Sequence, residues 1–286
     1  MSDGHAELTN HRKFHVVKRE DPVSYPYGDA LPNEFQWLGW DPEDADQKKD
    51  GQKIHEAFKQ WAELAKAGVT AAQGAPDNVH FKRFFGTQDA DDTKAIQNTM
   101  ANMYDNTAGT ATETIKGMVL ERSDFGNHCV TDGWFAYTDA ETGHFHMCPK
   151  AIATKQNSET QCTDFARDYI DNTARTLSFV MLHEFTHYDD VTDDRIGLMQ
   201  DHAITSVNCF NLDDEDKLEN AQSYAFNAAE QYWSDKCPNK DFTDPGVTRP
   251  AEPTEAVPAT TSEAPLPTEA VPATTSEAPL PTAPPS

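Results

Sequence analysis

Two histidines four positions apart, His183 and His187, carry the chemistry that is easiest to infer, and Glu184 directly follows the first of them. On a helix, positions i and i+4 lie on the same face, so the two imidazoles would converge on one point. Such a pair of nitrogens suits a tetrahedral zinc ion, and the adjacent glutamate can act on a zinc-bound water without being a ligand. The spacing therefore predicts a site for one Zn²⁺ ion, with His183 and His187 as metal ligands and Glu184 as the catalytic general base.

The segment that must position these groups is apolar from Leu177 to Leu182, with one serine in it. We expect a buried helix over residues 173–188 whose N-cap is one of residues 171–173, an Asp, an Asn and a Thr. Histidines and a glutamate in a buried helix are costly unless something pairs with them. This cost favours a bound metal over the alternative, a packed or solvated helix in which the histidines are coincidental.

A catalytic zinc ion needs a third protein ligand and one position left open for water. Four aspartates follow His187 closely, and His202 comes after them. The aspartates at 189 and 190 directly follow the helix and should point to solvent. Asp193 and Asp194 lie beyond a turn, from which the chain can return to the metal more easily. Either of these two is our candidate for the third ligand.

The remaining sequence predicts further helices and a few strands. Apolar residues at helical spacing favour helices over residues 52–67, 92–104, 163–170 and 216–233, with Gly68 ending the first. Residues 81–86 predict a short aromatic turn or helix end. Residues 20–50 are rich in Pro, Gly and Asp, and we expect an irregular arm whose aromatic side chains pack on the domain.

Strands are expected over residues 116–121, 133–137 and 144–148, and a polar turn should join the last two as a hairpin. His144 and His146 would then share one strand face. An accessory metal site is one interpretation of this pair, and solvated histidines are the interpretation that we favour. The predicted fold class is α+β and mainly helical, with a small antiparallel sheet or hairpin and a buried helix that carries the HExxH pattern.

The amino-acid composition limits which partners the protein could bind and which compartment it could occupy. The formal net charge of −25 argues against binding nucleic acid or anionic membranes through bulk electrostatics, and no apolar run is long enough for a transmembrane segment. The five cysteines include no C-x-x-C pair, which favours disulfides in an oxidising compartment over reduced cysteines in the cytosol. Cys129–Cys148 is the first pairing we expect and Cys209–Cys237 the second, which leaves Cys162 over.

Three regions differ in composition. Residues 1–19 contain no apolar segment of a signal peptide and end on the dibasic pair Lys18-Arg19, so they predict the remnant of a pro-segment. Residues 20–243 form the predicted folded domain. Residues 244–286 contain the 14-residue sequence PTEAVPATTSEAPL twice in succession, at 253–266 and 267–280. A repeat of this composition cannot bury a core and predicts a disordered, O-glycosylated tail.

These motifs resemble the aspzincin metalloendopeptidases, the family of the fungal deuterolysins and the lysine-specific endopeptidases. Its signature is HExxH followed by G-T-x-D-x-x-Y-G, whose Asp is the third zinc ligand. The segment 191–197 (VTDDRIG) matches the second part in a shortened form. Alignment on Thr-x-Asp selects Asp194, and alignment back from the glycine selects Asp193. Further landmarks in family order are 54–67 with 84–86, the hairpin between Cys129 and Cys148, and 220–226.

The resemblance implies a zincin-like domain and a secreted, monomeric, zinc-dependent endopeptidase that hydrolyses protein or peptide substrates by a zinc-bound water, with Glu184 as base. Two departures stand out. The family's Tyr, which helps to stabilise the tetrahedral intermediate, falls on Ile196 or is missing. Gln222 and Ala225 replace the acidic residues of the lysine-specific members, so lysine should not be selected. The alternatives are a secreted zinc-binding protein or surface antigen with impaired catalysis, and a wall-associated structural module.

Overall fold

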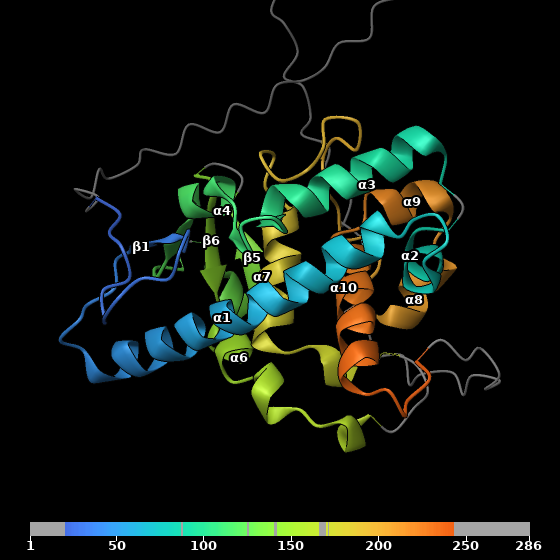
Figure 1. Ribbon diagram of the computed structural model, residues 1–286. Helices are drawn as coiled ribbons and strands as arrows, with labels where there is room; N and C mark the ends of the chain where they lie inside the picture. Colours follow the sequence, from blue (N-terminus) through green and yellow to red (C-terminus); the bar gives the residue numbers. More distant parts are fainter. Residues whose placement is uncertain are drawn as a thin grey trace, which may run out of the picture. The chain divides into compact units, whose positions relative to one another are not determined.

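The computed structural model describes residues 21–242 apart from 87, 125, 140–141, 166–169 and 171. The chain divides into two compact units, Met1–Gly246 and Val247–Ser286. The predicted pro-segment remnant and the repeat tail both lie outside the described residues. All the helices and strands drawn in Figure 1 belong to the first unit.

Helix α1 (Ala45–Gln73) is the longest described element and runs across α7 and α10 (Figure 1). The Asp44 side chain caps it by accepting hydrogen bonds from two backbone amides of the first turn. The prediction that Gly68 ends this helix is wrong, because the helix continues for another turn beyond it. A Cβ at Gly68 would lie 2.2 Å from Met100 Cε and 2.9 Å from Ala228 Cβ. Glycine is needed here for the close approach of three helices rather than for a helix end.

The other predicted helices are confirmed in part. The expected helix over 92–104 is confirmed as α3, whereas the one over 216–233 is two helices, α9 and α10, separated at Glu219–Asn220. The described part of 163–170 contains a 3₁₀ turn, η2, rather than an α-helix. The bounds are α2 Val79–Phe85, α3 Ala90–Met103, α4 Glu113–Gly117, α5 His128–Thr131, α6 Pro149–Ile152, η1 Asn157–Glu159, η2 Cys162–Asp164, η3 Asn172–Ala174, α7 Leu177–Thr186, α8 Ser206–Asn211, α9 Asp214–Leu218 and α10 Ala221–Lys236.

The main sheet has four strands in the order β1-β4-β6-β5. Their bounds are β1 Gln36–Leu38, β4 Val119–Glu121, β5 Ala136–Thr138 and β6 His144–Met147; β2 (Tyr104–Asp105) and β3 (Thr110–Ala111) form a separate pair. The predicted hairpin is confirmed, since β5 pairs with β6 in antiparallel register. The other two pairings of the main sheet are parallel, so the prediction of an antiparallel sheet is wrong beyond the hairpin.

The expected irregular arm supplies the edge strand β1. Trp37 in this strand is fully buried, and its neighbour Phe35 packs edge-on against Phe145 of β6 at 5.0 Å between ring centroids. A strand this short within a Pro-rich segment gives no clear alternation of polar and apolar residues. The sequence pattern therefore does not predict β1. The strand predicted from residue 116 begins at 119 because residues 113–117 form α4.

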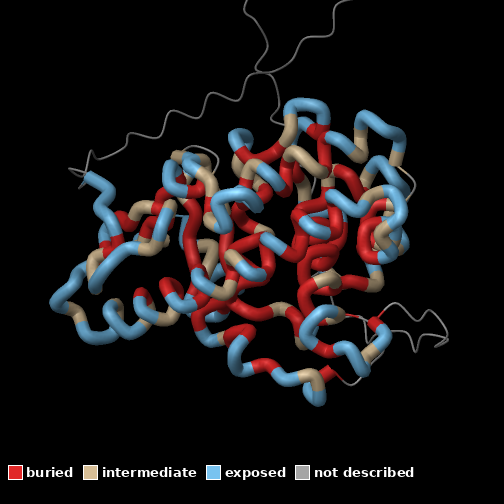
Figure 2. The backbone as a smooth tube through the Cα atoms, viewed as in Figure 1, coloured by how far each residue is buried: buried red, intermediate tan, exposed pale blue. Residues whose placement is uncertain are grey.

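Helix α7 lies in the middle of this unit, between the sheet and the helices α1 and α10 (Figure 1). Every residue of α7 except His183 is buried, and Figure 2 shows much of the middle of this unit in red, as buried. Phe185 on this helix meets Phe145 of the sheet at 5.2 Å and Trp61 of α1 at 5.3 Å, both in edge-to-face geometry. Aromatic packing of this kind on two sides fixes the helix against its neighbours.

Two disulfides are present among the described cysteines. Cys129–Cys148 is confirmed, with 5.2 Å between the Cα atoms. The second bond joins Cys162 to Cys237, so the predicted Cys209–Cys237 pairing is wrong. Cys209 is the free thiol and is fully buried, where its sulfur accepts a hydrogen bond from the Asn220 amide. The first pair lies at the two ends of one hairpin, whereas the second spans 75 residues and depends on tertiary packing.

The architecture is therefore α+β and mainly helical, which confirms the predicted fold class. None of the helices in the described part of the chain is long and apolar enough to span a membrane.

Candidate metal centre

The helix that carries the HExxH pattern is α7. It begins after Thr176, whose side chain accepts a hydrogen bond from the amide of Phe179, rather than after one of residues 171–173 as predicted. The residues just before it form the 3₁₀ turn η3, which delays the start of the α-helix. His183 and Glu184 lie in the last turns of α7, and His187 is its C-cap.

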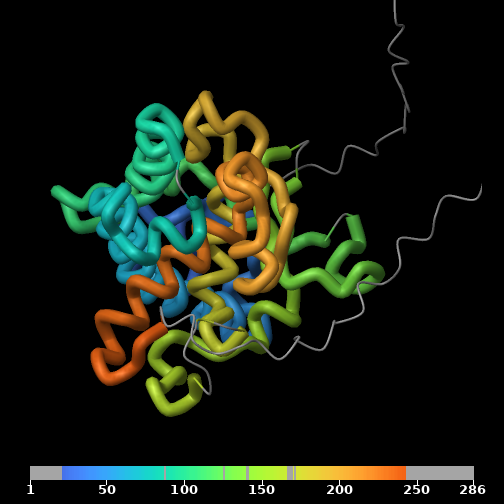
Figure 3. The backbone as a smooth tube through the Cα atoms, turned by 90° about the vertical axis from the view of Figure 1, so that its right-hand side faces the viewer, coloured from blue at the N-terminus to red at the C-terminus, as the bar shows by residue number. Residues whose placement is uncertain are grey.

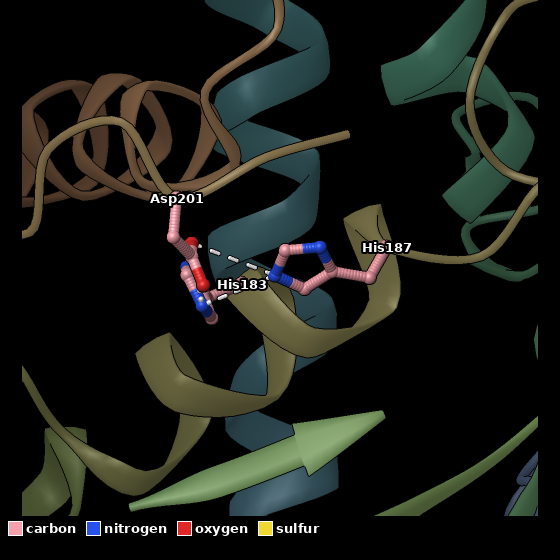
Figure 4. Close-up of side chains that lie close together, drawn as sticks. All are labelled: His183, His187 and Asp201. Carbon is pink, nitrogen blue, oxygen red and sulfur yellow. Dashed lines mark hydrogen bonds and ion pairs between the residues drawn. The ribbon is translucent and has the colours of Figure 1, made fainter. Parts of the chain in front are cut away.

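His183, His187 and Asp201 bring three metal-binding atoms together (Figure 4). Oδ1 of Asp201 lies 3.3 Å from Nε2 of His183 and 3.6 Å from Nε2 of His187, and the two histidine nitrogens are 3.4 Å apart. Nitrogen and oxygen ligands at about 2.0–2.1 Å from a tetrahedral zinc ion would be about 3.3 Å from one another. Two imidazoles and one carboxylate with these separations fit a zinc ion that keeps a fourth position for water.

Asp193 and Asp194, the two predicted third ligands, are not in this group, which is the one cluster of potential metal ligands among the described residues. Oδ2 of Asp193 accepts a hydrogen bond from the Asn98 amide at 2.7 Å, and its backbone N–H donates to the hydroxyl of Thr99. Asp194 is exposed. The segment after α7 therefore first packs on α3, and Asp201 supplies the carboxylate instead.

The chain returns to α7 only after Gly197, whose φ of +77° lies in the left-handed region that glycine adopts readily. Figure 3 shows this returning segment, in gold, next to the orange helices α8–α10. The backbone of Gln200 accepts a hydrogen bond from Ala221 N–H and donates one to the carbonyl of Glu219. On the other side of Asp201, the N–H of Ala203 donates to Oδ1 of Asn220. The backbone on both sides of Asp201 is thus hydrogen bonded to residues at the start of α10.

Charge and burial act in opposite directions on the three groups. Burial lowers the pKa of His183 to about 4, so this imidazole is neutral near pH 7, as a metal ligand must be. Burial alone would raise the pKa of Asp201, but the two histidines lower it to about 2. The Asp201 side chain remains 48 % exposed, so the cluster opens to solvent.

Glu184 lies beside the cluster and is almost completely buried, with 4 % of its surface exposed. Its Oε1 is 4.0 Å from Nε2 of His183, and its Oε2 accepts a hydrogen bond of 3.2 Å from the hydroxyl of Thr138. Burial raises the pKa of Glu184 to about 7 although His187 opposes this effect. A carboxyl group with a pKa near neutrality can both accept and return a proton.

A family model described as lysine-specific metallo-endopeptidase, of the aspzincin type, matches residues 70–229, which is more than half of the chain. The chain belongs to the aspzincin family. A solved structure, a zinc peptidase from Grifola frondosa, is similar with a TM-score of 0.36 and 12 % identity, over 63 % of this chain and 97 % of that chain. No curated protein matched the sequence.

Asp201 also changes how the aspzincin signature aligns with the chain. If Asp201 stands for the Asp of D-x-x-Y-G, the Tyr falls on Ile204 and the Gly on Thr205, instead of the Tyr falling on Ile196. The Asp is then the one residue of this half-signature that the chain retains. With one matching residue, the short motif alone could not identify Asp201. Ile196 and Ile204, the two positions on which the Tyr could fall, have no hydroxyl group.

Gln222 and Ala225, which the sequence resemblance places at the acidic positions of the lysine-specific members, are buried in α10. Gln222 donates a hydrogen bond to the carbonyl of Ile204 and also lies close enough to His183 to raise the pKa of that imidazole. Ala225 is fully buried. This part of α10 therefore presents an uncharged amide next to the first histidine.

The strand histidines are not solvated as predicted. His146 is buried and stacks on Tyr137 at 4.4 Å, while Nδ1 of His144 lies 2.8 Å from a carboxylate oxygen of Glu121. Among the described residues they belong to no second group of metal ligands.

Proposed function

We propose that this aspzincin is a zinc-dependent endopeptidase that binds one zinc ion through His183, His187 and Asp201. The observation that carries the proposal is the triangle of ligand atoms, whose sides measure 3.3, 3.4 and 3.6 Å. Two of these atoms belong to histidines at the end of the buried helix α7, and the third belongs to Asp201, which faces that end. It matches the ligand number and chemistry of catalytic zinc sites, in which three protein side chains leave one position open. Asp201 takes the role that the sequence suggested for Asp194 or Asp193.

A zinc ion in this position would polarise the scissile carbonyl and lower the pKa of a coordinated water. Glu184 is the general base of the proposed reaction: its carboxylate takes the proton of the attacking water and passes it to the leaving amine. The raised pKa of Glu184 supports both transfers, because neither protonation state is strongly favoured near pH 7. Burial around Glu184 excludes bulk water that would compete for the same proton.

The family description names lysine specificity, but we propose that cleavage by this chain is not confined to lysine. Selection of a cationic side chain requires negative charge in the pocket that receives it. Gln222 and Ala225 supply none, and Gln222 is already hydrogen bonded to Ile204. The substrates are therefore proteins or peptides without a required lysine.

We also propose that the protein acts outside the cell as a monomer. Its two disulfides are of the kind that persist in oxidising compartments. We propose in addition that a protease removes residues 1–19 by cutting after Arg19. N-terminal sequencing of the protein from its culture medium would test this cleavage. A mature protein that starts well before Glu20 would contradict the processing site.

The function is tested by casein hydrolysis with and without a chelator, together with the zinc content of the purified protein. We expect cleavage by the zinc-loaded wild type, and loss of at least about 100-fold in kcat for Glu184→Gln, since a general base contributes about 100- to 10,000-fold. The variant should keep its zinc. Full activity of Glu184→Gln would contradict the role of Glu184 as the general base. Zinc binding by a wild type that cleaves no substrate would indicate a binding protein without catalysis.

A further inference from the structure

Thr138 is the last residue of β5, the edge strand of the main sheet that packs against α7. Its hydroxyl donates to Oε2 of Glu184 at 3.2 Å and also lies 3.4 Å from the main-chain carbonyl oxygen of the same residue. Among the described residues, it is the hydrogen-bond donor to the Glu184 carboxylate. The proposed base therefore depends on one side chain from another element.

The two carboxylate oxygens of Glu184 face different surroundings. Oε1 lies 4.0 Å from Nε2 of His183 and is on the side of the metal cluster, whereas Oε2 is taken by Thr138. The last torsion of a glutamate side chain has broad, roughly two-fold minima, so it does not fix the plane of the carboxylate by itself. A hydrogen bond to one oxygen is then what decides where the other one points.

The distance between the hydroxyl and the carboxylate is set by the core rather than by the site. Thr138 is the register partner of Phe145 in the hairpin, and Phe145 packs against Phe185 of α7. Phe185 directly follows Glu184, and Phe145 lies across the hairpin from Thr138, so the contact between the two rings holds the sheet and the helix together beside both groups. This arrangement keeps the hydroxyl in place without any contribution from the metal.

We propose that Thr138 is a positioning residue that fixes the Glu184 carboxyl group so that Oε1 alone exchanges protons with the reacting water. The proposal rests on the proposed peptidase function. When Oε1 gains the proton of the water, Oε2 becomes the carbonyl oxygen of the neutral acid and still accepts the Thr138 hydrogen. The same hydrogen bond therefore serves both protonation states, and no proton passes through Thr138.

The test compares Thr138→Val, which keeps the shape of the side chain and removes the hydroxyl, with Thr138→Ser, which keeps the hydroxyl. We expect kcat to fall about tenfold in Thr138→Val with KM nearly unchanged, because one hydrogen bond to a charged group is lost. Thr138→Ser should stay within about twofold of the wild type, a change too small for loss of that bond. Thr138→Ala replaces the valine variant if the latter does not fold.

Two measurements besides activity separate positioning from a structural effect. Zinc content should be the same in all variants, and each should unfold cooperatively on heating, with a melting temperature lowered by no more than the loss of one hydrogen bond allows. In crystal structures of the zinc-loaded protein, the Glu184 carboxyl group should have one orientation in the wild type and Thr138→Ser, and more than one in Thr138→Val. Unchanged kcat in Thr138→Val, or equal losses in the valine and serine variants, would overturn the proposal. An inactive wild type would instead contradict the proposed function.

Discussion

Helix α7 and the segment after it, residues 188–205, contribute to the same site by different physical means. The helix places His183 by local geometry and is held by Phe185 in an aromatic core. The later segment first packs on α3 and places Asp201 through hydrogen bonds to the start of α10. Two of the three candidate ligands are thus placed by one helix and its C-cap, and the third depends on contacts between distant parts of the chain.

The largest difference between α7 and residues 188–205 should appear when the aromatic packing of α7 is removed. Phe185→Ala should lower the free energy of unfolding by about 3–5 kcal/mol, the usual cost of removing a buried aromatic side chain. Leu198→Ala is the matched control in residues 188–205, because Leu198 is 66 % exposed and should change stability by less than about 0.5 kcal/mol. Urea denaturation measures both. Similar losses in the two variants would show that α7 is not the better supported region.

Removing the carboxylate of Asp201 should affect the metal more than the fold. Asp201→Ala should weaken zinc binding by more than about 100-fold, since even the loss of partners around the ligands costs about 10- to 100-fold. Competition with a chromophoric chelator measures the affinity. Asp193→Ala and Asp194→Ala are the controls and should retain zinc. Loss of zinc in the Asp194 variant, with Asp201→Ala unaffected, would restore the ligand that the sequence suggested.

The packing of α1 against α3 and α10 can be disturbed without touching the site. Gly68→Ala puts a methyl group against Met100 and Ala228 and should cost about 1–3 kcal/mol of stability, as overpacked cores do. Gly117→Ala is the control, since a Cβ at Gly117 would meet no atom within 4 Å. Thermal unfolding of the chelated and zinc-loaded forms should show the same loss for Gly68→Ala. A destabilised zinc-loaded form alone would mean that this packing acts through the metal site.

The smallest effect is expected from the ion pairs that join residues 188–205 to α3. Arg195 lies within ion-pair distance of Asp89 and Asp92, and its side chain is 45 % exposed. Exposed pairs of this kind contribute little because water and salt screen them. Arg195→Ala should therefore leave the melting temperature and zinc affinity nearly unchanged. A clear loss of zinc would show that these pairs, rather than the contacts at the start of α10, position Asp201.

Features that depend on neighbouring residues could be predicted from the sequence. Helical spacing put His183 and Glu184 on one buried helix, and alternation with a polar turn gave the β5–β6 hairpin. The disulfide between Cys129 and Cys148 belongs to the same class, because both cysteines border that hairpin.

The features that could not be predicted depend on tertiary packing. Asp201 is 14 residues beyond His187 and reaches it only because Gln200 pairs with the start of α10. The Cys162–Cys237 bond and the parallel pairing of β1 with β4 likewise join segments far apart in the chain. The role of Gly68 also depends on tertiary packing, since a glycine that ends a helix and one that lets two other helices approach look alike in one sequence.

From the hydrogen bonds between Gln200 and the start of α10 we also expect a definite order of zinc binding and folding. A chain that has formed α7 but not yet docked residues 219–221 offers a metal two histidines and no third ligand. Tight zinc uptake should then come after the slow closure of long-range contacts, whose entropic cost precedes any stabilisation. Refolding in the presence of a fluorescent zinc indicator would show this delay. For an enzyme that cuts polypeptides, such a delay keeps the nascent chain inactive until its own fold is closed.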